Sequence, residues 1–272
     1  MTRPTVLVTG AAGTIGGDVL RLLRDDPEAG FDLVLTDADP DEGADSPVRG
    51  LDVRDLDATT RALEGVDTVI HLAGAASPEA SWEEVLDLNV VGTRTVLEAA
   101  HRAGVRRVVL ASSNHVMGMY DRERAWPVYT HQPVRPDSLY GVSKAMVEVL
   151  GRYYHDEHGL DVLALRIGWE SGDWGAADDE LTRAMWVSPR DMAQVLRRAV
   201  QAKVRYGVYY VVSDNPTRPW DLTNTMVDLG YRPQDSWQEA AGEEEAAGEE
   251  EPAGEEEPAG EEEPAGEDQP KG

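Results

Sequence analysis

A tyrosine and a lysine four residues apart form the pair in this chain best suited to carry out chemistry. Tyr140 and Lys144 follow Pro136 in a helical pattern, and such spacing places two side chains on one helix face. A phenol with a pKa of about 10 is a poor base at neutral pH, but a neighbouring ammonium favours the phenolate. Ser113 ends an apolar segment upstream and can orient a reacting oxygen. The three residues predict proton removal from an alcohol, with Tyr140 as the general base.

A glycine-rich loop near the beginning of the chain predicts a nucleotide site. Gly10, Gly13 and Gly16 follow an apolar segment directly and precede a helical pattern. Gly10 permits a tight turn, Gly13 lets the backbone approach a pyrophosphate, and Gly16 lets helix and strand pack closely. The phosphates would then lie on amides at the helix N-terminus. We therefore expect dinucleotide binding by this loop, including the residues between its glycines, Ala12, Thr14 and Ile15.

An aspartate at the end of the next apolar segment indicates which dinucleotide binds. Asp37 lies 21 residues after Gly16, where an acid would bind the hydroxyls of the adenosine ribose. A 2′-phosphate would be repelled by this carboxylate, and Thr14 stands in the loop where an arginine would be needed to neutralise it. The sequence therefore predicts NAD in preference to NADP. A cationic nicotinamide would also favour the Tyr140 phenolate, and Lys144 would hold the nicotinamide ribose.

The elements that must position these residues alternate between strands and helices. Short apolar runs rich in Val, Leu and Ile predict strands at residues 5–9, 31–36, 48–51, 68–72, 107–111, 162–167 and 208–212. Helical periodicity lies between them at residues 15–25, 55–64, 81–103, 137–158 and 188–201. This alternation predicts an α/β fold of the Rossmann type, a doubly wound parallel sheet with helices on both faces. Ligands of such sheets bind at the carboxyl ends of the strands.

Composition and charge limit the partners of the chain. The 272 residues include 52 acidic and 25 basic side chains, no cysteine, and a formal net charge of −27. Nucleic acids and anionic membranes are therefore poor partners, and no metal site is predicted. The sequence shows no run of 18 apolar residues and no charged leader, so we expect a cytoplasmic protein. Abundant Asp, Glu and Ala with only three lysines is typical of salt-accumulating archaea.

The last part of the chain differs in composition from the rest. Residues 239–272 contain 15 acidic residues and one lysine, in six-residue repeats of Ala-Gly-Glu-Glu-Glu-Pro. No apolar side chain larger than alanine is present there, so ordering would not be offset by burial. We expect a disordered acidic tail at 239–272, after one domain at 1–238. The substrate-binding portion would lie mainly in residues 168–238.

Several motifs, in order, resemble those of the extended short-chain dehydrogenase/reductases, the NAD-dependent epimerase/dehydratase family. The resemblance covers residues 5 to about 235 and includes Thr9-Gly10-x-x-Gly13-x-x-Gly16, Asp52-Val53, His71-Leu72-Ala73-Gly74, Asn89-x-x-Gly92-Thr93, Ser112-Ser113 and Tyr140-x-x-x-Lys144. It implies that Asp52 and Val53 contact adenine and that Asn89 steadies the helix bearing the lysine. It also implies further cofactor contacts from Leu72, Ala73, Gly74 and Ile167.

Within this family the chain is most similar to uronate dehydrogenases and to the NAD-dependent glucose-6-phosphate dehydrogenases of halophilic archaea. The resemblance implies oxidation of C1 of a cyclic sugar to a lactone, with Asn114 and His115 on sugar hydroxyls. Two departures bear on the substrate. Trp169 replaces a serine of the uronate dehydrogenases and offers a stacking face, while Leu181 occupies the place of their carboxylate-binding arginine. Arg183, offset by two, either replaces that arginine or faces solvent, so an aldose, a hexuronate and a sugar phosphate stay open.

Two other functions are compatible with the cofactor motifs. A nucleotide-sugar 4-epimerase or dehydratase shares them, but it needs a larger C-terminal lobe than the roughly 70 residues between Gly168 and the tail. A non-enzymatic NAD-binding regulator is the other alternative, and the presence of Ser113, Tyr140 and Lys144 argues against it. The predicted helices 81–103 and 137–158 resemble those that pair in dimers of this family, so we expect a homodimer.

Overall fold

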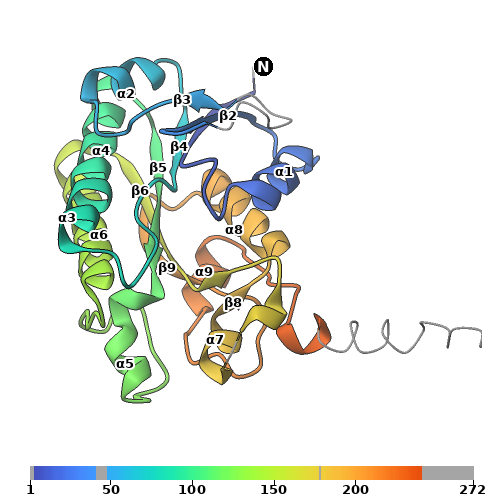
Figure 1. Cartoon of the computed structure of the whole chain (residues 1–272). Helices are drawn as coiled ribbons and strands as arrows, with labels where there is room; N and C mark the ends of the chain where they lie inside the picture. Colours follow the sequence, from blue (N-terminus) through green and yellow to red (C-terminus); the bar gives the residue numbers. More distant parts are fainter. Residues whose placement is uncertain (1–2, 41–47, 178, 241–272) are drawn as a thin grey trace, which may run out of the picture.

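A parallel β-sheet forms the centre of the protein in the computed structural model, which describes residues 3–40, 48–177 and 179–240 (Figure 1). Its seven strands follow the order β3-β2-β1-β4-β5-β6-β9. They are β1 (Thr5–Thr9), β2 (Asp32–Asp37), β3 (Arg49–Gly50), β4 (Thr68–His71), β5 (Arg107–Ser113), β6 (Asp161–Ile167) and β9 (Tyr206–Val211). The predicted Rossmann-type sheet is confirmed, and each predicted main strand ends within two residues of the observed one.

The strand order reverses at β1, and this reversal creates the ligand-binding crevice. β1 pairs with β2 on one side and with β4 on the other, so the loops after β1 and β4 lie side by side. Gly10, with φ of 71°, stands where these loops meet. A Cβ atom on Gly10 would lie 2.5 Å from the backbone nitrogen of Ala73, so only glycine lets the loops approach this closely.

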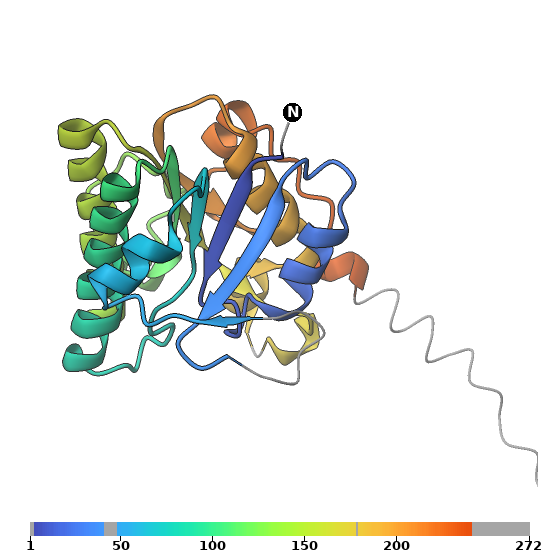
Figure 2. The same cartoon turned by 90° about the horizontal axis from the view of Figure 1, so that it is seen from above.

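Helices cover both faces of the sheet, as the two layers in Figure 2 show. One face carries α1 (Gly17–Asp25) and α8 (Pro189–Gln201), and the other carries α2 (Leu56–Ala62), α4 (Gly92–Ala103) and α6 (Leu139–His158). Alternate strand residues feed the two cores, since Val6 and Val8 belong to one buried cluster and Leu7 to the other. This packing gives the crevice rigid walls.

The predicted helix 81–103 is interrupted by a wider turn. α3 (Trp82–Glu84) leads into the π-helical segment η1 (Val85–Val91), which continues as α4. Ser81 caps α3 by accepting a hydrogen bond from the amide of Glu84 at 3.3 Å. Asn89 lies within the π-helical segment and is buried. Such segments frequently occur at functional sites, because the extra residue redirects side chains.

Short elements that the sequence pattern does not predict gather at the carboxyl ends of the strands. They include η2 (Asn114–Met117), α5 (Gly118–Arg122), β7 (Trp169–Glu170), η3 (Trp174–Ala176), α7 (Glu180–Met185), β8 (Trp186–Val187) and α9 (Thr223–Asp228). β7 and β8 pair in parallel as a separate two-stranded sheet. In Figure 1, α7 and β8 lie close together in the lower part of the molecule, and α5 lies apart from them below α6. Most of these elements come from residues 168–238, the portion predicted to bind substrate.

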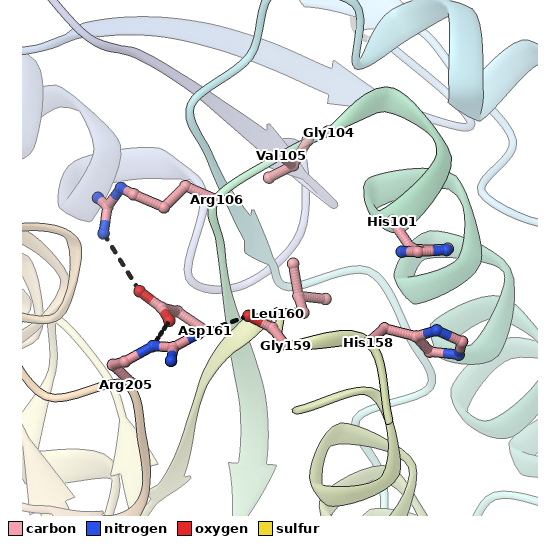
Figure 3. Close-up of a pocket in the computed structure, with 9 residues that line it drawn as sticks. All are labelled: His101, Gly104, Val105, Arg106, His158, Gly159, Leu160, Asp161 and Arg205. Carbon is pink, nitrogen blue, oxygen red and sulfur yellow. Dashed lines mark hydrogen bonds and ion pairs between the residues drawn. The ribbon is translucent and has the colours of Figure 1, made fainter. Parts of the chain in front are cut away.

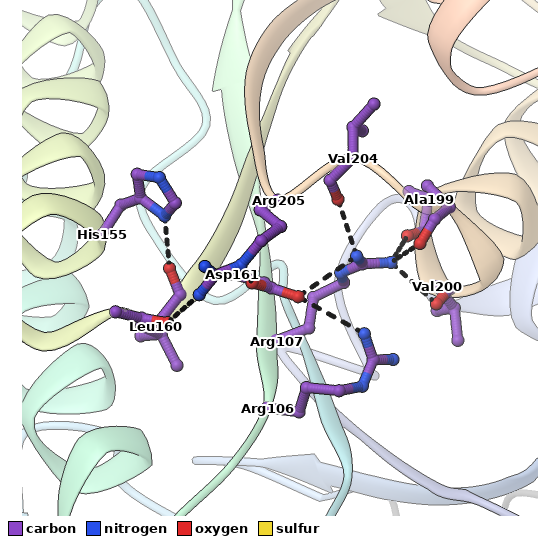
Figure 4. A network of polar contacts seen from close by, with 11 residues as sticks. Arg106, Arg107, His155, Leu160, Asp161, Ala199, Val200, Val204 and Arg205 are labelled. Atoms are coloured by element: carbon purple, nitrogen blue, oxygen red, sulfur yellow. Dashed lines mark hydrogen bonds and ion pairs between the residues drawn. The ribbon is translucent and has the colours of Figure 1, made fainter.

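A buried arginine, Arg107, lies at the end of the sheet opposite the crevice, where the strands begin (Figure 4). Arg107, at the start of β5, donates hydrogen bonds to the carbonyl oxygens of Ala199, Val200 and Ala202 at 2.7 to 3.0 Å. It also contacts Asp161, which accepts a hydrogen bond from Arg205 at 2.8 Å. Arg107 therefore caps the C-terminus of α8 and fastens this helix to the sheet.

A cavity of about 430 Å³ opens at the amino ends of the strands, far from their carboxyl ends (Figure 3). The loops that precede β5, β6 and β9 line it, and it includes His101, His158 and Arg205. The rings of His101 and His158 lie 4.3 Å apart. Arg106 and Arg205 both form ion pairs with Asp161 there, so Asp161 partly neutralises their charges.

The described part of the chain ends just after the predicted start of the acidic tail. Most of the predicted acidic tail, residues 241–272, lies outside the described residues, whereas Glu239 and Ala240 complete a helical turn on Ser236. Among the described residues, no helix is long and apolar enough to cross a membrane.

Candidate active site

The structure brings the three predicted catalytic residues together at one end of the sheet. Ser113 is the last residue of β5, and Tyr140 and Lys144 lie on the first turns of α6. Ser138 caps this helix by accepting a hydrogen bond from the amide of Gly141 at 3.1 Å. Helix periodicity then directs both side chains toward the end of β5. All three residues are buried.

Lys144 is held by the strand that carries Ser113. Its Nζ donates a hydrogen bond to the carbonyl oxygen of Ala111 at 2.8 Å and lies 5.6 Å from the centre of the Tyr140 ring. Burial lowers the pKa of Lys144 to about 8, because the ammonium is removed from water. The lysine therefore keeps its charge at neutral pH and loses it in mildly alkaline solution.

The pKa of Tyr140 is raised in this structure, whereas the sequence analysis expects a neighbouring positive charge to lower it. Burial raises the pKa of its phenol, and a hydrogen bond with Ser113 acts in the opposite direction. Burial disfavours the phenolate, whereas a nearby positive charge favours it. If Tyr140 acts as the general base, a positive charge from Lys144 or from an oxidised nicotinamide must favour its phenolate.

A chain of buried hydrogen bonds fixes α6 against the π-helical segment η1. The Nδ2 of Asn89 donates to the carbonyl oxygen of Ala75 at 3.1 Å and to the hydroxyl of Ser143 at 2.9 Å. Ser143 in turn donates to the carbonyl oxygen of Tyr140 at 2.7 Å. Asn89 thus contacts the helix turn that bears Tyr140 and Lys144, the position expected from the family resemblance.

The crevice beside the glycine loop is a cavity of about 470 Å³. Its lining includes eleven of the residues predicted to bind the cofactor: Gly10, Ala12, Gly13, Thr14, Ile15, Asp37, Asp52, Val53, Leu72, Ala73 and Gly74. Asp37 is fixed at the mouth, since its carboxylate accepts hydrogen bonds from the amides of Ala12 at 2.9 Å and Asp39 at 3.1 Å. Gly16 lies outside the lining and packs so closely on Ala11 that a Cβ atom would not fit.

The shape and donors of this crevice fit a dinucleotide. Glycine backbone lines the region where a pyrophosphate would bind, and the carboxylate of Asp37 lies where a ribose would present its hydroxyls. Only glycine fits at position 74, because a Cβ atom there would lie 2.4 Å from Oδ1 of Asn89. That Oδ1 atom is buried and has no hydrogen-bond partner in the described part of the chain.

A second cavity, of about 240 Å³, continues the crevice to the catalytic residues. It shares Thr14, Ile15, Leu72, Gly74 and Ala76 with the first cavity and adds Ala111, Ser112, Ser113, Tyr140, Lys144, Ile167, Gly168, Trp169 and Glu170. The pairing of Trp169 with Trp186 holds this wall in place. A small molecule in the second cavity would therefore lie beside both Tyr140 and the inner end of a bound dinucleotide.

Three residues predicted to bind substrate do not line this cavity. Asn114 is buried and donates a hydrogen bond to the sulfur of Met185. The Nδ1 of His115 lies 3.0 Å from both carboxylate oxygens of Asp137. Arg183 neither reaches the cavity nor faces solvent freely, because its guanidinium carbon lies 5.6 Å from the centre of the Trp237 ring. Packing within the C-terminal portion determines the position of Arg183.

Two acidic residues that the sequence analysis did not select lie at or near the site. Glu170 lines the second cavity directly after Trp169, and Asp137 orients His115, whose ring packs edge-on against Tyr140 with centres 5.7 Å apart. Burial acts to raise the pKa of Asp137, but hydrogen bonds and charge from His115 hold it below its usual range. In the sequence, only its position just before Ser138, the cap of α6, could have identified Asp137 as a residue near the site.

No group of three or more histidine or acidic side chains placed to hold a metal ion occurs among residues 3–40, 48–177 and 179–240. The arrangement instead combines a dinucleotide crevice with a buried serine, tyrosine and lysine. Such a site suits proton transfer coupled to hydride transfer at one carbon atom.

Known proteins are similar to this chain in sequence and in structure. The chain is 43% identical to an L-arabinose 1-dehydrogenase (NAD(P)(+)) of Haloferax volcanii, with 85% of this chain and 96% of that protein covered. It is 37% identical to an NAD-dependent glucose-6-phosphate dehydrogenase of the same organism, with 86% and 94% covered. A uronate dehydrogenase variant from Agrobacterium tumefaciens complexed with NAD matches with a TM-score of 0.76 and 28% identity, over 93% of this chain and 92% of that one.

The family comparison agrees with the motifs and with the crevice. The model of the NAD dependent epimerase/dehydratase family matches residues 6–220, which include the glycine loop, the residues lining both cavities and the predicted catalytic residues. The chain therefore belongs to the NAD-dependent epimerase/dehydratase family.

Proposed function

We propose that this protein is an NAD-dependent dehydrogenase that oxidises C1 of a cyclic sugar to the lactone. One observation carries the proposal: the cavity containing Ser113, Tyr140 and Lys144 opens directly into the dinucleotide crevice. The names of the relatives, an arabinose 1-dehydrogenase, a glucose-6-phosphate dehydrogenase and a uronate dehydrogenase, support oxidation of a sugar.

The glycine loop and Asp37 would hold the adenosine half of NAD, and Lys144 would hold its nicotinamide ribose. NAD, when bound, accepts the hydride from C1 of the sugar. Ser113 donates a hydrogen bond to the C1 oxygen and orients it toward Tyr140. The phenolate of Tyr140 removes the hydroxyl proton, and the Lys144 ammonium stabilises that phenolate. The apolar side chains of Ile15, Leu72 and Ile167 exclude water from the reaction.

A direct assay separates this proposal from the two alternatives. The protein with NAD should form NADH when a free aldose, hexuronate or sugar phosphate is added, with a lactone as the product detected by NMR. Nucleotide sugars should give no reaction, because the roughly 70 residues between Gly168 and the tail leave little chain to hold a nucleoside diphosphate. Turnover of nucleotide sugars alone would favour an epimerase or dehydratase. NAD binding without turnover of any of these compounds would favour a regulator.

The cofactor preference depends on Asp37. We expect a kcat/KM for NAD at least about tenfold above that for NADP, because a 2′-phosphate would approach the carboxylate within a few ångströms. Asp37→Asn should reduce this ratio by about tenfold, measured with the same sugar at constant salt. Asp32→Asn is the matched control, since Asp32 begins the same strand with an exposed side chain. Equal efficiency of the unmodified protein with both cofactors would contradict this role of Asp37.

We also propose that two copies of the chain pair through α6 and the π-helical segment η1. An exposed apolar stripe supports this pairing: Val91, Leu139, Met146, Val149 and Tyr153 are 37% to 69% exposed on these elements. Helical spacing places the four residues of α6 on one face. The strong acidic excess further supports work in the cytoplasm of a salt-accumulating cell, with no nucleic acid or membrane as a partner.

A further inference from the structure

Glu148 continues the predicted catalytic face of α6 by one more turn. It follows Tyr140 and Lys144 at the same spacing of four residues, so the three side chains lie on one side of the helix. Like them, Glu148 is buried. Its carboxylate accepts a hydrogen bond from Oγ of Ser112 at 2.6 Å. Ser112 directly follows Ala111, whose carbonyl oxygen accepts the hydrogen bond of Lys144. A carboxylate and an ammonium therefore lie on adjacent turns of one buried helix face.

The charges of Glu148 and Lys144 would attract each other if both were free. Opposite charges four residues apart on a helix commonly pair, and burial strengthens the attraction because water no longer screens it. Such a pair would draw the ammonium along α6, away from Tyr140. In the structure, Nζ of Lys144 instead binds the carbonyl oxygen of Ala111 at 2.8 Å and lies beside the crevice, where a Cβ atom on Gly74 would be 3.8 Å from it. Another cation must therefore balance the carboxylate.

Arg166 of β6 binds the carboxylate of Glu148. Its Nε donates to Oε1 and its Nη2 donates to Oε2, both at 2.8 Å. The ion pair is buried, with 2% of the Arg166 side chain and 8% of the Glu148 side chain exposed. Burial acts to lower the pKa of Arg166, but hydrogen bonds and charge from Glu148 hold it above its usual value. Both carboxylate oxygens are thus bound, and the charge of Glu148 is balanced.

The pairing of the strands fixes the position of this guanidinium. Arg166 stands directly opposite Ser112 of β5 and directly opposite Tyr210 of β9. Its guanidinium carbon lies 5.5 Å from the centre of the Tyr210 ring. The cation that binds Glu148 is therefore held by the rigid centre of the sheet.

We propose that Arg166 is a positioning residue for Lys144: by binding Glu148, it leaves the ammonium free for the cofactor and for Tyr140. The inference rests on the proposed dehydrogenase function, in which Lys144 binds the nicotinamide ribose and stabilises the phenolate. Arg166 itself lines neither cavity. The two partners of the ion pair then have unequal roles, because loss of Arg166 releases a carboxylate that competes for Lys144, whereas loss of Glu148 removes the competitor.

Arg166→Met leaves the Glu148 carboxylate buried without its counter-charge. With NAD and the best sugar of the aldose, hexuronate and sugar phosphate panel, kcat should fall about 10- to 100-fold, because Lys144 is drawn out of position. The Kd for NAD, measured by calorimetry, should rise about tenfold as the ribose loses a charged donor. Arg102→Met is the matched control, since Arg102 forms a more exposed ion pair with Glu98 on α4.

The pH profile gives a readout that lost packing would not change. Lys144, with a pKa of about 8, sets the alkaline fall of kcat/KM in the original protein. In Arg166→Met this fall should move up by about one pH unit, because a neighbouring carboxylate raises the pKa of an ammonium. Two other ionisable groups near Lys144 stay the same: Tyr140 precedes it by one turn, and His71 of β4 is uncharged, since burial lowers its pKa to about 3.

Removing the carboxylate as well should reverse these effects. In the double variant Glu148→Gln/Arg166→Met no buried charge competes for the ammonium of Lys144. Turnover, NAD affinity and the pH profile should therefore return most of the way to those of the original protein. Glu148→Gln alone should keep turnover per folded molecule and NAD affinity, because glutamine brings no charge to Lys144. A loss in either variant as large as that in Arg166→Met would show that the ion pair only supports the fold, and it would overturn the inference.

Two provisions keep the test decisive. If Arg166→Met yields too little folded protein, Arg166→Lys takes its place, because lysine keeps a cation beside Glu148 but cannot donate the two parallel hydrogen bonds. It should weaken NAD binding and move the pH profile in the same directions, and unchanged values would overturn the inference. Should no sugar reduce NAD with the original protein, the proposed function fails, whereas the NAD affinities of the variants still decide the role of Arg166.

Discussion

Tyr140→Phe is expected to lower kcat for sugar oxidation by about 10²- to 10⁴-fold, the usual contribution of a general base. The loss corresponds to about 3 to 5 kcal/mol of activation free energy. Phenylalanine keeps the ring that packs beside His115 but removes the oxygen that takes the proton. The affinity for NAD, measured by calorimetry, should change little, because we assign those contacts to the glycine loop, Asp37 and Lys144.

Two further variants separate chemistry from cofactor binding. Lys144→Ala should damage both turnover and NAD affinity, since one ammonium serves the phenolate and the ribose. Tyr153→Phe is the matched control, because Tyr153 lies on the same helix with 55% of its surface exposed. Near-normal turnover of Tyr140→Phe with the true sugar would remove Tyr140 from the mechanism.

The pH dependence of Tyr140→Phe provides a second readout. Burial raises the pKa of Tyr140, so the phenolate fraction of the original protein grows as pH rises above neutrality. Its kcat/KM should therefore rise with pH until Lys144, whose pKa is about 8, loses its charge, and this rise should disappear in Tyr140→Phe.

Arg107→Met is expected to lower the free energy of unfolding by about 3 to 5 kcal/mol, the largest effect on stability that we expect from one substitution. The side chain of Arg107 is 1% exposed and donates hydrogen bonds to the carbonyl oxygens of Ala199, Val200 and Ala202. Methionine fills similar space but leaves these oxygens buried without donors. The C-terminus of α8 would lose its cap and its attachment to β5.

Denaturant unfolding at constant salt measures this loss. Arg106→Met is the matched control. The neighbouring Arg106 side chain is 54% exposed, and its contact with Asp161 is long, at 3.5 Å. Its cost should be within about 1 kcal/mol, as for other exposed ion pairs. A similar small cost for both variants would show that water replaces the donors of Arg107. Activity per folded molecule should be retained in Arg107→Met, since the arginine lies at the edge opposite the active site.

The main sheet and the cofactor crevice were predictable because their signals are local. The glycine spacing after β1, the aspartate at the end of β2 and the alternation of strands with helices all act over short stretches of chain. The π-helical segment η1 escaped prediction, because its residues share the apolar periodicity of the helices on either side. The two-residue strands β7 and β8 are too short to show any periodicity.

The substrate portion depends on contacts between distant residues. Arg183 lies close in sequence to the position expected for an anion-binding arginine, but its partner Trp237 is 54 residues away. Glu170 enters the cavity wall through the pairing of β7 with β8. His115 lies beside Asp137 from another loop. Sequence spacing could identify candidates here, but it could not determine which of them would reach the cavity.

The small sheet of β7 and β8 sets one wall of the site apart from the cofactor crevice. Redox chemistry and cofactor contacts are built on the seven-stranded sheet and α6, whereas the wall formed by Trp169 and Glu170 belongs to this separate two-stranded sheet. Substitutions in the smaller sheet would therefore reshape the wall beside the predicted catalytic residues and leave the cofactor crevice on the seven-stranded sheet unchanged.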